Sequence, residues 1–215
     1  MKTRVILASS SPQRTDILRE LGIVFDAIPM DVDEVVLSTP EATVQENARL
    51  KALAAYAKFP HKIVIAADTV ISHRGTILGK PRNASDAAAV LSGMSGSKVI
   101  AVTAVAVINA SAQCACIATE SAAAHIRELT NDDISWYIGT GEPLTRAGSL
   151  GISRYGEIFV EKIEGAYSCF SGLPKRALLA AIARIGLAGE ILPNGLPVDP
   201  IIVAQGLSFT EIKLG

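Results

Sequence analysis

The run "KIVIAADTVI", residues 62–71, constrains the fold of this 215-residue chain more than any other segment. It is almost continuously apolar and is interrupted near its end by Asp68 and Thr69. Strands that are buried on both faces have this composition, and they usually belong to parallel sheets covered by helices. The sequence therefore predicts an α/β fold that contains this strand.

Strand and helix patterns alternate before and after this run. Residues 4–8 have the pattern of a strand, and Ser11 followed by Pro12 predicts a helix that ends before Gly22. A long Ala-rich helix is expected over residues 40–59. This alternation is typical of the α/β class.

The second half of the chain predicts two long neighbouring strands, at residues 98–109 and 114–129. Before them, Ser85 is expected to cap a short helix that ends at Leu91, and after them Thr130 and Asp133 resemble a capping box. The remaining elements are a Gly-rich loop, a strand and a closing helix, at residues 141–157, 158–165 and 173–187. Two long adjacent strands make the sheet partly antiparallel.

Residues 1–187 are predicted to form a single domain, followed by a tail at residues 188–215. The tail is rich in Pro, Gly and apolar residues without clear periodicity. It could cover an edge of the core, join an interface in a homodimer or be loose.

Composition and charge exclude several classes of protein. The formal net charge is −1, so no overall field favours nucleic acid or a membrane surface as a partner. The apolar runs are too short to cross a membrane, and the start lacks a signal peptide. The three cysteines have no zinc-binding spacing. We therefore expect a cytoplasmic protein without nucleic-acid or membrane partners.

The segment "LASSSPQR", residues 7–14, places Ser9, Ser11 and Arg14 where a strand gives way to a helix. A helix N-terminus carries unpaired N–H groups and partial positive charge, so these side chains could form a phosphate site. In the alternative interpretation, Ser11 only caps the helix and Arg14 is solvated.

Three further positions offer charged groups. Asp68 is expected at the end of a buried strand, where it could hold a metal, accept a proton from water, or merely cap a turn with Thr69. Lys51 shares a helical stripe with small apolar residues, but it lies in solvent if the opposite face is the buried one. Lys80, between Gly79 and Pro81, could contact a phosphate or lie in a surface turn.

The acidic residues Asp31, Asp33 and Glu34 could ligate Mg²⁺ or Mn²⁺, or form a solvated loop. The three histidines are scattered and receive no catalytic role. Cations that neutralise phosphates, a metal and a carboxylate that activates water are together the requirements of phosphoanhydride hydrolysis.

Ten short strings in order make the chain resemble the Maf family of nucleoside triphosphate pyrophosphatases, over residues 4 to about 186. They are "LASSSPQR", "DVDE", "ARLKA", "AADTV", "LGKP", "LSGMSG", "TAVAV", "GEP", "AG" and "GLP". The resemblance implies a two-lobed α/β fold, with a mixed twisted sheet flanked by helices and a central cleft. It also implies a divalent metal and cleavage of a nucleoside triphosphate to the monophosphate and pyrophosphate.

The resemblance also implies roles for individual residues. Asp68 would be the proton acceptor, with Glu34 and Asp68 holding the metal. The phosphates would be contacted by Arg14, Lys51 and Lys80, with Ser9 and Ser11 lining the same loop. Changing either lysine to Met should then weaken nucleotide binding with little loss of stability.

Thr69 resembles the branch of the family that acts on dTTP and UTP, whereas the branch acting on 7-methyl-GTP usually carries Gln there. The chain departs from the family at Gln13, where a second arginine is usual, and at Val99, where a histidine is common. Ser153 replaces a glutamine, so we expect relaxed base selectivity. The alternatives are a nucleotide-binding regulator of cell division without turnover, a 7-methyl-GTP pyrophosphatase, and a phosphatase that releases orthophosphate.

Overall fold

The computed structural model describes the chain at residues 3–152, 154–194, 196, 199 and 203–214. The chain divides into two compact units. The first contains residues 1–68, 103–120 and 172–215, and the second contains residues 69–102 and 121–171.

The strands of the described residues form a mixed sheet in the order β2-β1-β3-β5-β6-β7, with β4 paired to β3 and β8 to β6. Strand β1 is parallel to β2 and β3, whereas β4 pairs antiparallel with β3, and β7 and β8 pair antiparallel with β6. This arrangement confirms the α/β class and the partly antiparallel sheet. The strands are β1 (Val5–Leu7), β2 (Phe25–Ala27), β3 (Val64–His73), β4 (Thr76–Leu78), β5 (Lys98–Asn109), β6 (Cys114–Ile126), β7 (Val160–Glu164) and β8 (Ser208–Glu211).

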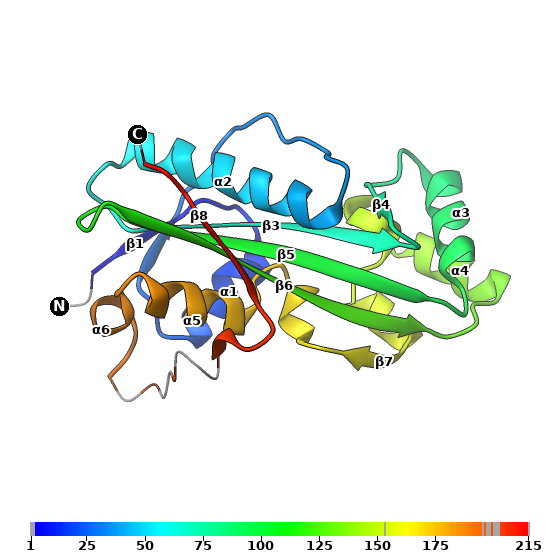
Figure 1. Cartoon of the computed structure of the whole chain (residues 1–215). Coiled ribbons are helices and arrows are strands. Elements are labelled where there is room, and N and C mark those ends of the chain that lie inside the picture. The colour runs from blue at the N-terminus through cyan, green and yellow to red at the C-terminus, as the bar shows by residue number, and fades with distance from the viewer. Residues whose placement is uncertain (1–2, 153, 195, 197–198, 200–202, 215) are drawn as a thin grey trace. The chain divides into compact units, whose positions relative to one another are not determined.

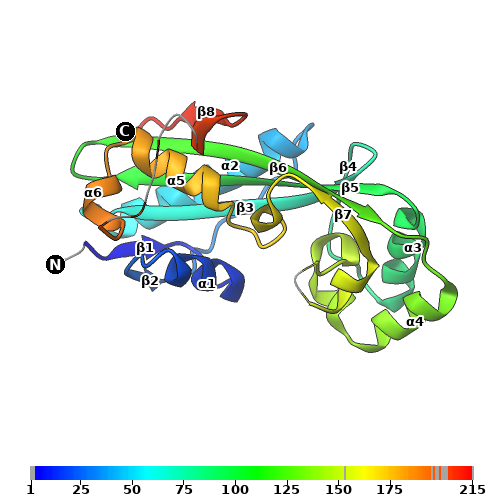
Figure 2. The same cartoon turned by 90° about the horizontal axis from the view of Figure 1, so that it is seen from below.

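In the first unit, helices cover both faces of the strands. Helix α2 (Pro40–Lys58) lies on one face, and α1 (Pro12–Glu20), α5 (Lys175–Arg184) and α6 (Ala188–Ile191) lie on the other (Figures 1 and 2). The larger apolar side chains gather beneath α1 and α5, including Leu18, Ile65 and Leu178. On the α2 side the helix contributes mainly small buried residues, which allow it to approach the strands closely.

The starts and ends of α1 and α2 follow from local sequence. Ser11 occupies the N-cap position of α1 as predicted, but its side chain makes no capping hydrogen bond. Its hydroxyl donates to Gln13 Oε1 at 3.0 Å instead. Gly22 ends the helix with a φ of +65°, which glycine adopts without steric cost. Thr39 caps α2 by accepting from the N–H of Ala42.

The described part of the C-terminal tail packs against the first unit. Ile191 and Leu192 are buried in its core, and β8 pairs with β6 in a register that places Phe209 opposite Ala118. Arg176 of α5 donates a hydrogen bond to the carbonyl of Gln205. These contacts attach the described tail residues to the rest of the first unit.

The second unit contains α3 (Ala84–Met94) and α4 (Asn131–Gly139), which pack against each other, and several short 3₁₀ helices. The 3₁₀ helices are η1 (Glu142–Thr145), η2 (Ala147–Ser149), η3 (Tyr155–Phe159) and η4 (Tyr167–Cys169). Its core includes the buried rings of Tyr137 and Phe159, whose centroids lie 5.2 Å apart in an edge-to-face arrangement. The segment at residues 141–157 was expected to be a Gly-rich loop, but η1 and η2 lie in it and η3 begins in it.

The predicted cap at Ser85 is wrong, because α3 begins one residue earlier, at Ala84. Its N-cap is Asn83, whose side chain accepts a hydrogen bond from the N–H of Asp86 at 2.9 Å. Asparagine is about as good an N-cap as serine, and the helix uses Asn83, two residues before Ser85. The helix also runs past the predicted end at Leu91 to Met94.

The capping box of Thr130 and Asp133 at the start of α4 is confirmed. The carboxylate of Asp133 also accepts two hydrogen bonds from Arg127, at 2.8 and 2.7 Å. These bonds to Arg127, together with those from Thr130, hold the pKa of Asp133 well below its ordinary value. A lowered pKa means that the ionised form stabilises the fold above the ordinary pKa, and that this contribution is lost as the pH falls.

We therefore expect Asp133→Asn to lower stability at neutral pH. The midpoint of urea unfolding should fall relative to the wild type at pH 7, and this difference should shrink progressively below pH 4, where the unfolded wild type begins to bind the proton. A difference that stays constant between pH 7 and pH 3 would show that the Asp133 charge does not contribute.

No helix in the described part of the chain combines the length and the apolar character that a membrane span requires. The three cysteines, Cys114, Cys116 and Cys169, are all free. Burial raises the pKa of the Cys116 thiol to about 11, which makes it a poor nucleophile at neutral pH.

Candidate functional site

Asp68 lies inside β3 and not at its end, because the strand continues to His73. The expectation that the strand ends at this acid is therefore wrong. The residues after it, such as Val70 and Ile71, suit a strand and extend it. Strand β1, which is parallel to β3, does end nearby, since Leu7 is paired with Ile65. The loop that follows β1 and the part of β3 that follows Ile65 therefore lie at the carboxyl end of this parallel pair of strands. Ligands of α/β folds bind at this end of the sheet.

The carboxylate of Asp68 is almost buried and is bound by a lysine. Its Oδ1 accepts a hydrogen bond from Lys51 Nζ at 2.6 Å, and the same Nζ lies 2.7 Å from Oε1 of Glu34. The Lys51 side chain is only 12% exposed, which confirms that it points inward and excludes the solvated alternative. One ammonium group therefore bridges two carboxylates, and Asp68 does not cap a turn.

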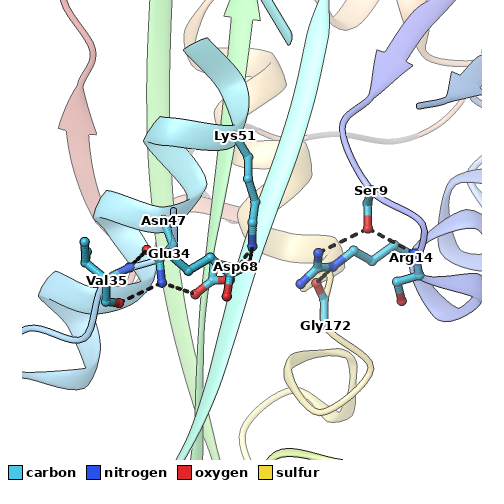
Figure 3. A network of polar contacts seen from close by, with 9 residues as sticks. Ser9, Arg14, Glu34, Val35, Asn47, Lys51, Asp68 and Gly172 are labelled. Carbon is cyan, nitrogen blue, oxygen red and sulfur yellow. Dashed lines mark hydrogen bonds and ion pairs between the residues drawn. The ribbon is translucent and has the colours of Figure 1, made fainter. Parts of the chain in front are cut away.

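The segment that carries Glu34 has no regular secondary structure between β2 and α2. Asn47 of α2 fastens it, because its Oδ1 accepts from the N–H of Val35 at 2.8 Å and its Nδ2 donates to the carbonyl of Val35 at 3.1 Å. The same Nδ2 lies 3.2 Å from Oδ2 of Asp68. Both oxygens of Asp68 thus accept hydrogen bonds from α2, as Figure 3 shows.

Arg14 projects from α1 and is fixed by two acceptors. Its Nε donates to the carbonyl of Gly172 at 2.8 Å, and its Nη1 donates to Oγ of Ser9 at 3.2 Å. Ser9 Oγ also accepts from the N–H of Ser11 at 3.1 Å, so the serine loop and the guanidinium form one network. This network excludes the interpretation that Arg14 is merely solvated.

The guanidinium of Arg14 points toward the carboxylate of Asp68 (Figure 3). Burial lowers the pKa of Arg14, while the negative charges of Asp68 and Glu34 act in the opposite direction. Arginine remains charged despite such a shift, because its ordinary pKa lies far above neutrality. Two cations and two carboxylates therefore share this part of the first unit.

The other candidate residues have different locations. Thr69 follows Asp68 directly and is half-buried, and Lys80 is exposed after β4; both belong to the second unit. Ser153 lies outside the described residues. The roles of these residues in substrate binding therefore stay predictions.

Glu34 is the member of the acidic segment that contacts the site. Asp31 and Asp33 are exposed, as expected for a solvated loop. Within the part of the chain that the structure describes, no group of three or more His, Cys, Asp or Glu side chains is arranged to hold a metal ion. A cation here would therefore have two carboxylate ligands and would take its others from water or substrate.

The reasoning from sequence did not identify Asn47 or Gly172. Asn47 lies four residues before Lys51 on α2, one turn away on the same face, so the helical stripe that singled out Lys51 contained the signal. Gly172 contributes only its main-chain carbonyl, and it lies 158 residues from Arg14 in the sequence. The pattern of side chains therefore does not predict this hydrogen bond.

Comparison with known proteins gives a consistent family assignment. The sequence model of the family described as Maf-like protein matches residues 4–185. A protein of Anaeromyxobacter dehalogenans (strain 2CP-1 / ATCC BAA-258) named dTTP/UTP pyrophosphatase is 42% identical over 193 residues, which cover 86% of this chain and 96% of that protein.

Two more distant relatives carry the same name. The dTTP/UTP pyrophosphatase of Methylobacillus flagellatus is 38% identical over 190 residues, covering 86% of this chain and 94% of the relative. That of Caldicellulosiruptor saccharolyticus is 34% identical over 197 residues, covering 87% and 99%. The similarity therefore extends over nearly the whole of each relative.

Proposed function

Because this chain belongs to the Maf-like protein family, we propose that it is a nucleoside triphosphate pyrophosphatase that acts on dTTP and UTP. The reaction consumes water and one triphosphate, and it yields a nucleoside monophosphate and pyrophosphate. The observation that carries the proposal is the site of the first unit, where the Lys51 ammonium lies between the carboxylates of Glu34 and Asp68 and Arg14 faces Asp68.

Arg14 and Lys51 are the proposed phosphate ligands in the first unit. The guanidinium of Arg14 is already oriented by Ser9 and Gly172, so little side-chain entropy is lost when a phosphate binds. The ammonium of Lys51 can replace its contact with one carboxylate oxygen by a contact with a phosphate oxygen, while the helix that carries it stays in place. Lys80 of the second unit is a third proposed ligand.

The carboxylates of Glu34 and Asp68 fit a divalent cation. Their oxygens Oε1 and Oδ1 already converge on one positive charge, at 2.7 and 2.6 Å from Lys51 Nζ. Mg²⁺ and Mn²⁺ prefer such hard oxygen ligands and are often held by one or two carboxylates together with substrate phosphates. When bound, such a cation neutralises phosphate charge and orients the scissile phosphoanhydride.

Asp68 is the proposed proton acceptor. As water attacks the phosphoanhydride between the α- and β-phosphates, one proton of the water passes to the Asp68 carboxylate and pyrophosphate leaves. Lys51 and Asn47 each donate to one Asp68 oxygen, which fixes the plane of the carboxylate. A proton acceptor held in a fixed orientation contributes roughly 10²–10⁴-fold to a hydrolytic rate.

Turnover of a panel of nucleotides tests this proposal. The purified protein is incubated with dTTP, UTP, CTP, GTP and 7-methyl-GTP, with Mg²⁺ or Mn²⁺, and kcat/KM is measured for each. We expect the highest values for dTTP and UTP. A preference for 7-methyl-GTP would assign the chain to that branch instead, and tight binding without turnover would favour a nucleotide-binding regulator.

Base selectivity gives a separate prediction. Serine is too short to reach a base edge that glutamine reaches, so Ser153 should leave selectivity relaxed. We expect the wild type to hydrolyse several triphosphates with a modest preference for pyrimidines, and Ser153→Gln to sharpen it. If the ratios of kcat/KM among the five nucleotides are the same in both proteins, Ser153 does not read the base.

The cytoplasm is the proposed location, since nucleoside triphosphate pools lie there and three free cysteines suit a reducing compartment. In that setting the enzyme would remove nucleotides, including modified ones, from the pool. Assembly as a homodimer stays a prediction.

A further inference from the structure

The side chain of Asn47 forms three hydrogen bonds, which connect the Glu34 segment with Asp68. It is 3% exposed, and its Oδ1 accepts from the N–H of Val35. Its Nδ2 donates both to the carbonyl of Val35 and to Oδ2 of Asp68. A reversed amide would place its oxygen against two other oxygens, so the partners fix its orientation.

Two of these three hydrogen bonds are made with the main chain of Val35. The N–H and carbonyl of Val35 already satisfy the amide oxygen and one amide hydrogen. The second amide hydrogen is directed to the carboxylate of Asp68. Asn47 and Lys51 lie four residues apart on α2, so one helical face supplies the donors to both oxygens of Asp68.

Two bridges therefore connect residues 34–35 to Asp68. The first is ionic and runs through the Lys51 ammonium to Glu34, and the second runs through the neutral amide of Asn47 to Val35. Phosphate oxygens and a divalent cation compete with the ionic bridge, because they bind the same charges. The amide bridge is uncharged, so we expect it to be retained if the ammonium shifts to a phosphate.

We propose that Asn47 is a positioning residue, which holds the Glu34 segment against Asp68 so that the two carboxylates can bind one divalent cation. This proposal rests on the proposed function of the site. Asn47 itself touches neither the substrate nor the cation in this account. It acts by opposing the mutual repulsion of two carboxylates.

Thr43 provides a matched control. It lies one turn before Asn47 on α2, is 1% exposed, and its hydroxyl accepts from the N–H of Leu37 at 2.9 Å. It also donates to the carbonyl of Thr39 at 2.8 Å. Thr43→Val therefore removes buried hydrogen bonds to the same connecting segment while leaving the contacts of Asp68 intact.

The test compares Asn47→Leu, the smaller Asn47→Ala and Thr43→Val with the wild type, after thermal unfolding shows that each is folded. Mn²⁺ affinity of the nucleotide-free protein is measured by electron paramagnetic resonance, and kcat and KM for UTP are measured at saturating Mn²⁺. We expect both Asn47 variants to bind Mn²⁺ about 10-fold more weakly or worse, as partners that orient metal ligands contribute roughly 10–100-fold.

The same variants should lose about 10-fold or more in kcat, because Asp68 loses its orientation, while KM for UTP changes less. Thr43→Val should keep Mn²⁺ affinity and kcat close to the wild type. Equal losses in Thr43→Val and the Asn47 variants, or unchanged Mn²⁺ affinity and kcat in the Asn47 variants, would overturn the proposal. If the wild type hydrolyses no triphosphate but Mn²⁺ affinity still falls selectively in the Asn47 variants, the positioning role stands and the proposed function fails.

Discussion

Replacing Asp68 by Asn is expected to lower turnover of UTP by at least ~10²-fold while the protein remains folded. The amide has nearly the same shape as the carboxylate, and its oxygen can still accept from Asn47 or Lys51. It cannot take a proton from water, and it is a weaker ligand for a divalent cation. The measurement is kcat for UTP at saturating Mg²⁺, together with a thermal unfolding curve.

Asp16→Asn is the matched control, because it makes the same change of charge at an exposed position on α1, and among the described residues Asp16 forms no hydrogen bond or ion pair with a member of the site. Asp16 forms an exposed ion pair with Arg19 at 2.8 Å, which contributes little to stability. Its kcat should therefore equal that of the wild type. Near-normal turnover in a well-folded Asp68→Asn variant would remove Asp68 from the mechanism.

Changing Lys51 to Met should have the second large effect, on both binding and stability. A charge-assisted hydrogen bond contributes roughly 1.5–3 kcal/mol, so affinity for UTP should fall about 10-fold or more. The structure changes the expectation that stability is hardly affected. Removing the ammonium leaves the nearly buried carboxylate of Asp68 without its cation, which should reduce the free energy of unfolding by about 1–3 kcal/mol.

Lys80→Met is the companion variant, since Lys80 is exposed in the second unit. It should weaken UTP binding with no measurable loss of stability. Calorimetry with UTP and urea unfolding separate the two effects for each variant. Wild-type affinity in both would refute the role of the lysines, and wild-type stability of Lys51→Met would show that the ion pair with Asp68 contributes nothing.

The elements with strong local signals could be predicted from the sequence. The capping box of Thr130 and Asp133 depends on side chains three residues apart, and it forms as expected. The start of α3 was misplaced because Asn83 and Ser85 are both good caps, and local sequence ranks them poorly. The 3₁₀ helices η1 and η2 both contact α3, which lies far from them in the sequence, and no local pattern reveals such contacts.

Only part of the candidate site could be predicted from the sequence. The helical stripe of α2 and the apolar strand singled out Lys51 and Asp68 as candidates, but local sequence left open whether Lys51 points inward or lies in solvent. Their direct contact joins residues 17 positions apart, and the bridge from Asn47 to Val35 joins residues 12 apart. Residues so far apart in the sequence show no periodic pattern that pairs them. The partners of each charged group therefore could not be predicted and are known only from the structure.

The products formed from UTP test the central claim most directly, namely that water cleaves the bond between the α- and β-phosphates. Phosphorus NMR of the wild-type reaction with Mg²⁺ should show UMP and pyrophosphate appearing in equal amounts, and neither should accumulate appreciably with Asp68→Asn over the same period. Formation of UDP and orthophosphate, or of no product at all, would contradict the account.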